Sequence, residues 1–190
     1  MNTDTVLRVA EKSDQRTIWL DKGEAYFQVK HDAARPFIVK TGAYRVIDLG
    51  TKFSVRASGS GIEVTLMEGR ARLQIPNAKS GTQSTDLMPG DIAVATATSF
   101  SLTKKPVQAL AYDLGWRQGL LTFHETTLAD AAADFNRYND AKLVVGDRDA
   151  AQLKINGTFP VHDVAEFARV ARDVFGLRVV NNANETMISR

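Results

Sequence analysis

The sequence predicts two domains of different fold class: an all-β lobe, solenoid-like or a twisted sandwich, followed by a small α+β lobe. From residue 6 to residue 103, short apolar-polar alternations are separated by Gly, Pro, Asn, Asp and Ser, without a ten-residue helical period. After about residue 110, strand and helix patterns alternate instead. We therefore expect domains at 1–108 and 113–190, and the 44% of hydrophobic residues allows each a core.

The strands expected in the first lobe are short and lie between turn-forming residues. They are 17–20, 25–29, 37–40, 44–50, 51–56, 62–66, 71–75, 91–96 and 100–103.

The first lobe also repeats part of its own sequence. Residues 18–29 align with 64–75 at an offset of 46, and Leu20/Leu66, Gly23/Gly69, Ala25/Ala71 and Gln28/Gln74 are identical. Both copies predict a strand, a turn with glycine and a second strand. Duplicated β units that cannot bury their faces alone stack on each other, which is why we expect a solenoid or a twisted sandwich.

The second lobe begins after a connector at 102–116 and opens with a strand at 120–123. A helix is predicted at 126–139, with Thr127 as N-cap and Asp130 closing a capping box.

The same scheme then recurs. Strands are expected at 142–146 and 153–159, a second helix at 162–176, and final strands at 177–182 and 186–190. Asp163 is the expected N-cap of the second helix and Gly176 its C-terminal glycine. An offset of 36 aligns the two halves, for example Phe123 with Phe159. We expect this βαβ repeat to form one small sheet with both helices on one face.

Composition and motifs argue against several kinds of site. The net charge is +2, from 24 basic and 22 acidic residues, which favours no nucleic-acid partner. The chain has no cysteine, and its histidines, at 31, 124 and 162, lack metal-ligand spacing. No nucleotide-binding motif occurs. We therefore expect no catalytic, cofactor-binding or metal-binding residue and no cofactor.

The sequence shows no pattern of a membrane helix or of a signal peptide. No run approaches the ~18 apolar residues that a membrane helix needs. The first residues lack the apolar core of a signal peptide. We expect a soluble chain without membrane contact of its own.

The stretch 21–37 holds acids, a tyrosine and a histidine, and it raises the question of catalysis. The second copy has Arg70 where the first has Glu24, so a glycine turn explains both copies better than a reacting site. Two alternatives remain open at this stage. One is a glycan-acting enzyme that uses Glu24 or Glu68, and the other is a structural or adhesive β module.

Several ordered segments resemble a known family. The runs "GEAYFQV", "ARPFIVKTG", "LGTKFSVR", "VTLMEGRARL" and "LMPGD" look like the signature of the FecR family. "GWRQGLLTFHETTLADAAADFNRYN" followed by "INGTF" is similar to the STN domain (secretin and TonB short N-terminal). FecR proteins usually carry a longer β segment before "GEAYF", together with a cytosolic anti-sigma region and one membrane helix. The resemblance therefore implies an excised periplasmic part whose β lobe lacks some strands.

The resemblance implies a role in cell-surface signalling rather than an enzyme. FecR-type proteins are single-pass inner-membrane regulators of an extracytoplasmic-function sigma factor, which they contact through a cytosolic region outside this sequence. Their periplasmic part binds the N-terminal signalling domain of a TonB-dependent outer-membrane receptor, often one that imports ferric siderophores. By this resemblance, the chain is a periplasmic signal-transduction module that takes part in regulating iron transport.

We expect the partner-binding residues in the lobe at 113–190. An exposed Trp-Arg pair is typical of protein contacts, and one of the final strands should lie at a sheet edge that accepts a partner strand. The predicted contact residues are Trp116, Arg117, Leu121, Phe123, Val179 and Ile188. The alternative for Trp116 is packing between the two lobes.

Overall fold

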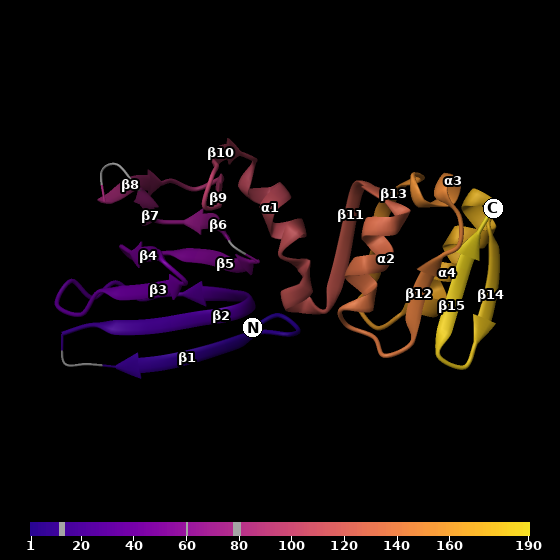
Figure 1. Cartoon of the computed structure of the whole chain (residues 1–190), viewed down its shortest axis with the longest axis horizontal. Helices are drawn as coiled ribbons and strands as arrows, with labels where there is room; N and C mark the ends of the chain where they lie inside the picture. The colour runs from indigo at the N-terminus through magenta and orange to yellow at the C-terminus, as the bar shows by residue number, and fades with distance from the viewer. Residues whose placement is uncertain (12–13, 60, 78–80) are drawn as a thin grey trace. The chain divides into compact units, whose positions relative to one another are not determined.

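A computed structural model of the chain describes residues 1–11, 14–59, 61–77 and 81–190. The described chain divides into two compact units, Met1–Ala111 (unit 1) and Tyr112–Arg190 (unit 2) (Figure 1). Each unit has its own cluster of buried apolar side chains.

Unit 1 is a curled β-sheet. In the described part of the chain the sheet has ten strands, in the order β10-β9-β6-β5-β2-β3-β4-β7-β8, with β1 paired to β2. Their bounds are β1 Val6–Glu11, β2 Arg16–Gln28, β3 Phe37–Thr41, β4 Tyr44–Asp48, β5 Lys52–Ser58, β6 Gly61–Glu68, β7 Ala71–Asn77, β8 Gly81–Leu87, β9 Asp91–Ala95 and β10 Phe100–Lys104.

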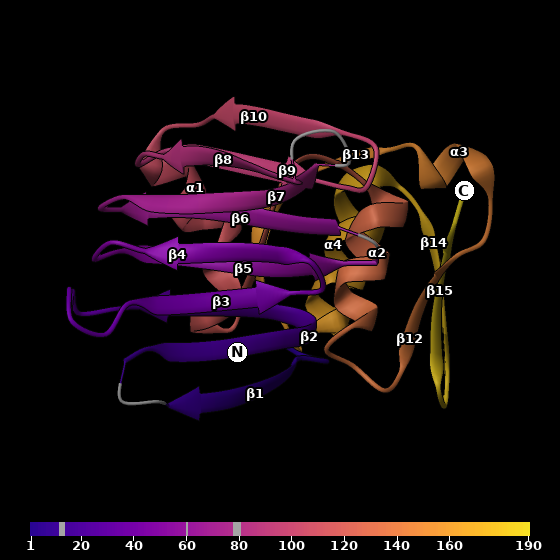
Figure 2. The same ribbon diagram turned by 60° about the vertical axis from the view of Figure 1, so that its left-hand side comes forward.

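The sheet folds over on itself into two layers (Figures 1 and 2). Layer A contains β1, the first half of β2, β3, β4, β7 and β8, and layer B contains the second half of β2, β5, β6, β9 and β10. Alternate residues of the inner strands, such as β4 and β9, point between the layers, whereas the edge strand β10 is exposed along its length. Val39 and Leu73 from layer A share one core with Val55 and Val64 from layer B, and all four are fully buried. The mostly β architecture expected for this part is confirmed, as one curled sheet that folds into two layers.

Only one of the two repeat copies has the predicted break between strands at its glycine. We expected strand, turn and strand in both, but β2 runs without a break through Gly23, whereas β6 ends at Glu68 and β7 begins at Ala71. Both glycines have positive φ, 87° at Gly23 and 83° at Gly69. In each copy, the glycine lets the chain pass from one layer to the other.

Close backbone contacts explain why both copies keep the glycine. A Cβ atom on Gly23 would lie 2.6 Å from Cα of Thr5, and one on Gly69 would lie 2.0 Å from the carbonyl oxygen of Gly50. Thr5 and Thr51 are themselves 46 residues apart. The repeat therefore extends to the turn that packs against each glycine.

Unit 2 follows α1 (Val107–Asp113), which crosses the boundary between the units. Its elements are η1 Gly115–Gln118, β11 Leu120–Thr127, α2 Leu128–Asn136, β12 Lys142–Val145, α3 Arg148–Ala151, β13 Lys154–Pro160, α4 Val164–Phe175, β14 Arg178–Asn182 and β15 Glu185–Ser189. The short helix α3 was not expected, because four residues are too few for a periodic apolar pattern.

The strands of unit 2 form two sheets in the described chain, not the single small sheet that we expected. β11 pairs with β13, and β15 lies between β12 and β14. The first strands of the two βαβ units thus pair with each other, while the second strands meet on β15. Helices α2 and α4 lie between the two sheets (Figure 1), so apolar side chains from both sheets pack into one cluster with the helices.

The helix ends of unit 2 follow the predicted capping residues. Thr127 Oγ1 accepts a hydrogen bond from the backbone N–H of Asp130 at 3.1 Å and donates to the Asp130 carboxylate at 2.5 Å. In a capping box, the second hydrogen bond runs from the N-cap backbone N–H to the side chain three residues later, whereas here it joins the two side chains. Asp163 accepts from the backbone N–H of Glu166 at 2.9 Å, and Gly176 ends α4 with a left-handed φ of 65°.

Candidate partner-binding surface

Half of the predicted contact residues lie in the core of unit 2. Leu121, Phe123 and Ile188 are 8%, 2% and 0% exposed. The Phe123 ring centroid lies 6.1 Å from those of Phe159 and Phe167. The surface position expected of these three residues is wrong, because the inward side of β11 and β15 faces the helices and the side chains pack in the core of unit 2.

The Trp-Arg pair lies on the surface side of η1. Trp116 is half-buried and Arg117 is exposed. Gly119 closes the turn with a φ of 75° and leads directly into β11. The pair is therefore held on a short turn at the start of β11.

Strand β14 is an edge strand of the described three-stranded sheet, since it pairs with β15 on one side only. Its backbone groups on the other side are placed to accept a further strand. Val179 is half-buried and is paired in register with the buried Ile188, so its side chain faces the core. The expected edge strand is therefore present, but the valine exposed on its outer face is Val180 and not the predicted Val179.

The outer face of this sheet carries an apolar row that the sequence reasoning missed. Val180 pairs with Met187, and Met187 pairs with Val144 on the other side. Val180 is 37% exposed, and the other two are half-buried. Because side chains alternate along a strand, a shift of one residue moves the apolar set to the opposite face. "VV" at 179–180 could be assigned to either face from the sequence alone.

Polar pairs border the apolar row on both sides. One border is formed by Lys142, Glu185 and Asn182, which are neighbours in the sheet register. At the other, the backbone N–H of Arg190 donates to the Asp147 carboxylate at 2.7 Å. Backbone N–H groups, first that of Ala150 and then that of Arg190, hold the pKa of Asp147 below its ordinary value. An apolar centre with a polar rim is the usual anatomy of a protein interface.

The two carboxylates of the glycan-hydrolysis alternative are engaged in the fold. Glu24 is 9% exposed and accepts hydrogen bonds from Asn2 Nδ2 at 2.8 Å and Ser54 Oγ at 3.0 Å. Glu68 is exposed and pairs with Lys52 at 2.6 Å. Glu68 lines an open cavity of about 590 Å³ together with Lys52, and neither carboxylate is among the described residues that line a second cavity of unit 1.

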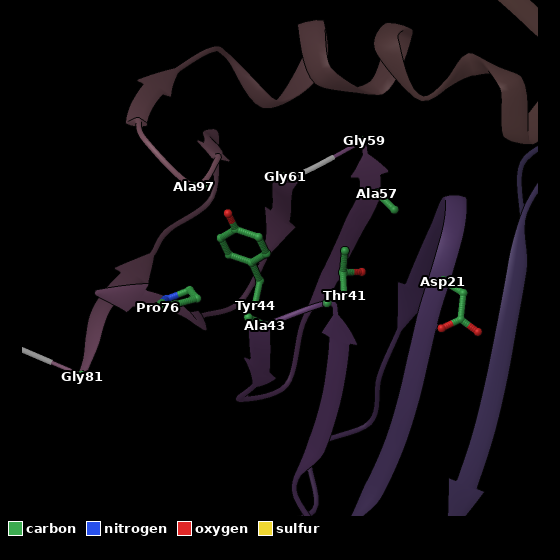
Figure 3. Close-up of a pocket in the computed structure, with 11 residues that line it drawn as sticks. Asp21, Thr41, Ala43, Tyr44, Ala57, Gly59, Gly61, Pro76, Gly81 and Ala97 are labelled. Carbon is green, nitrogen blue, oxygen red and sulfur yellow. The ribbon is translucent and has the colours of Figure 1, made fainter. Parts of the chain in front are cut away.

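The second cavity, of about 650 Å³, lies where the hairpin loops of unit 1 meet. Figure 3 shows Tyr44 among loops that consist mostly of small residues, with Asp21 at one side. Asp21 is held by two hydrogen bonds from Arg8, at 2.7 and 2.8 Å. The described lining residues thus contribute one carboxylate, which already has a cation partner. The arrangement offers no pair of free acids.

Metal ligands are not gathered anywhere in the described ranges, since no group of three His, Cys, Asp or Glu side chains could hold an ion. His31, His124 and His162 are separate and exposed. No helix among the described residues has the length and hydropathy needed to span a membrane.

Comparison with known proteins connects unit 1 with a family. Residues 1–72 match the family model described as FecR protein. Residues 1–72 are therefore a FecR region. A search of curated proteins gave no match.

Solved structures show the same fold over the FecR region and beyond it. Two crystal structures of a putative anti-sigma factor from Parabacteroides distasonis ATCC 8503, at 1.65 and 2.50 Å resolution, are 23% identical to this chain, with TM-scores of 0.76. The alignments cover 99% and 100% of this chain and 87% and 88% of theirs. The chain thus shares its fold, in both units, with these structures.

Proposed function

We propose that this chain is the periplasmic sensing part of a FecR-type transmembrane anti-sigma regulator. In this proposal, unit 2 is an STN-like module at 113–190 that binds the N-terminal signalling domain of a TonB-dependent outer-membrane receptor. Binding relays whether the receptor holds its ligand, a ferric siderophore in the simplest case, to an extracytoplasmic-function sigma factor. The FecR match at residues 1–72 and the fold shared with the anti-sigma factor structures support the regulatory part of the proposal.

The observation that carries the docking site is the free edge of β14 beside the apolar row of Val180, Met187 and Val144. A strand added to β14 would bond through its backbone, and alternate side chains would select the partner by meeting Val180 on the outer face. Trp116 and Arg117 supply further surface contacts of the kinds that dominate interface energies.

Calorimetric titration with the signalling domain of a TonB-dependent receptor recovered by pull-down from outer-membrane extract tests the site. Val180→Asp places a charge in the apolar row, and we expect it to weaken binding by at least about 10-fold, because a desolvated, unpaired carboxylate costs several kcal/mol in an interface.

Val174→Asp is the matched control. Val174 is 70% exposed on α4, so the same substitution there should leave affinity within about twofold. Equal affinities for the two variants, with both folded by circular dichroism, would show that β14 is not the docking site. A pull-down from outer-membrane extract that recovers no TonB-dependent receptor would favour the structural or adhesive alternative.

A further inference from the structure

The charge of the chain is divided unevenly between its units. Residues 1–111 hold 15 basic and 11 acidic side chains, a net charge of +4, and residues 112–190 hold 9 basic and 11 acidic, a net charge of −2. The β unit is therefore the basic part of a nearly neutral chain. Part of its positive charge lies in one row on the outer face of layer A.

The strand register defines this row. Side chains aligned across β1, β2, β3, β4, β7 and β8 are Arg8, Trp19, Lys40, Arg45, Gln74 and Ser84. Their sequence neighbours Val39, Val46 and Leu73 are fully buried between the layers, so the row faces outward. Six strands at about 4.8 Å spacing make the row roughly 24 Å long.

Two cations in the middle of the row are not neutralised within the described chain. Lys40 and Arg45 are directly opposite each other on β3 and β4, where like charges destabilise a sheet. The nearby acids have other partners: Asp21 accepts two bonds from Arg8, and Asp86 accepts two from Arg72. No carboxylate among the described residues pairs with Lys40 or Arg45.

Trp19 holds the basic side chains in place. The Arg8 guanidinium lies 5.7 Å from the centroid of its ring and the Lys40 ammonium 5.4 Å from it. Contacts of this kind restrict flexible basic side chains before any partner arrives, which reduces the entropy cost of binding. The array is thus more ordered than isolated surface lysines.

An apolar pair lies beside the cations. Ile38 and Ile47, two residues along the strands from Lys40 and Arg45, are paired in register and half-buried. The face therefore offers positive charge and, about 7 Å away along the strands, aliphatic surface. A complementary ligand carries negative and apolar groups in two adjacent stripes.

We propose that the outer face of layer A binds an acidic, amphipathic segment of a partner protein. A helix of about 16 residues is roughly 24 Å long and can present a glutamate stripe beside a leucine stripe. A glycan or a bare phosphate would leave the isoleucines without a partner. A flat lipid headgroup layer would meet the long basic side chains but not the recessed isoleucines. The proposal does not depend on the receptor docking at β14.

A synthetic peptide tests the proposal. The probe has about 16 residues, with Glu on one helical stripe and Leu on the next, and carries a fluorescent label for anisotropy. The chain has two tryptophans, so Trp116→Phe leaves Trp19 as the single tryptophan reporter. We expect saturable binding that weakens with salt and shifts Trp19 emission.

Two matched double variants distinguish binding at this row from a general effect of net charge. Lys40→Gln/Arg45→Gln should weaken binding by about 10-fold or more, because it removes both charges that would pair with the glutamates of the peptide. Lys30→Gln/Lys154→Gln removes the same charge at exposed positions elsewhere and should change affinity by less than about twofold. A peptide with Ser in place of Leu should bind more weakly than the parent peptide.

Four results would overturn the proposal: equal losses in the two double variants, no change in Trp19 emission, equal binding of the Leu and Ser peptides, or failure of the parent peptide to bind. Tighter, Lys40/Arg45-dependent binding of phosphatidylglycerol vesicles or of a sulfated oligosaccharide would overturn it in favour of those ligands. Unfolding midpoints of all variants must stay close to the parent value, so that lost binding is not lost folding.

Discussion

At the scale of single residues, the backbone geometry at position 69 requires a glycine. It combines a positive φ of 83° with a backbone oxygen where its Cβ would lie, while Gly42, with a φ of 54°, has no atom within 4 Å of that position. Their substitutions should therefore have unequal costs.

We expect Gly69→Ala to destabilise unit 1 by at least about 3 kcal/mol, since backbone strain adds to a steric clash. Gly42→Ala should cost only about 1 kcal/mol, from the positive φ alone. Urea denaturation followed by circular dichroism measures both, and equal losses would contradict the role given to the Gly50 contact.

Asn2 is a second residue with a defined structural role. Asn2 is 7% exposed; its backbone N–H donates to the Glu24 carbonyl at 2.8 Å, and its side chain donates to the Glu24 carboxylate. Asn2→Ala should cost about 1–3 kcal/mol, because the buried carboxylate of Glu24 loses a donor. Ser84→Ala, on the exposed edge strand β8, is the control and should change stability by less than about 0.5 kcal/mol. A cost no larger than that of the control would mean that water replaces the lost donor.

At the scale of elements, most strands with apolar alternation could be predicted from the sequence, whereas β1, residues 6–11, and β8 were not expected. Strand β8, residues 81–87, is polar except for its last residue and was not expected. Its side chains carry no period-two signal because it is an exposed edge, and only pairing with β7 identifies it as a strand. Likewise, Val179 and Val180 are alike in chemistry, so the face that each occupies depends on the register with β15.

The end of β15 is an element whose stability should depend on pH. The lowered pKa of Asp147 means that its carboxylate is better stabilised in the folded protein than in the unfolded chain. This contribution is complete above the ordinary carboxyl pKa of 3.8 and is lost as pH falls through the lowered folded value.

Amide exchange measured by NMR between pH 7 and pH 2 tests this dependence. The Arg190 and Ala150 amides, which donate to Asp147, should lose protection at the acidic end of the range. Asp147→Asn should remove that acidic step. An unchanged step in this variant would assign it to another carboxylate.

At the scale of the whole molecule, composition and repeats predicted a β-rich fold, and residues 1–72 match the FecR family. The separation of unit 2 into two sheets could not be predicted, because strand-helix-strand order is compatible with several pairings. The sequence placed only some of the proposed contact residues correctly: Arg117 is exposed and Trp116 is half-buried, whereas Leu121, Phe123 and Ile188 are in the core.

The continuous course of β2 through Gly23 has a consequence for how unit 1 unfolds. Its first half pairs with β1 and β3 and its second half with β5, so a single strand belongs to both layers. Neither layer can come apart without breaking hydrogen bonds of the strand that also holds the other. A force or a partner acting on one face would therefore be felt on the opposite face, and the two layers should melt as one cooperative unit.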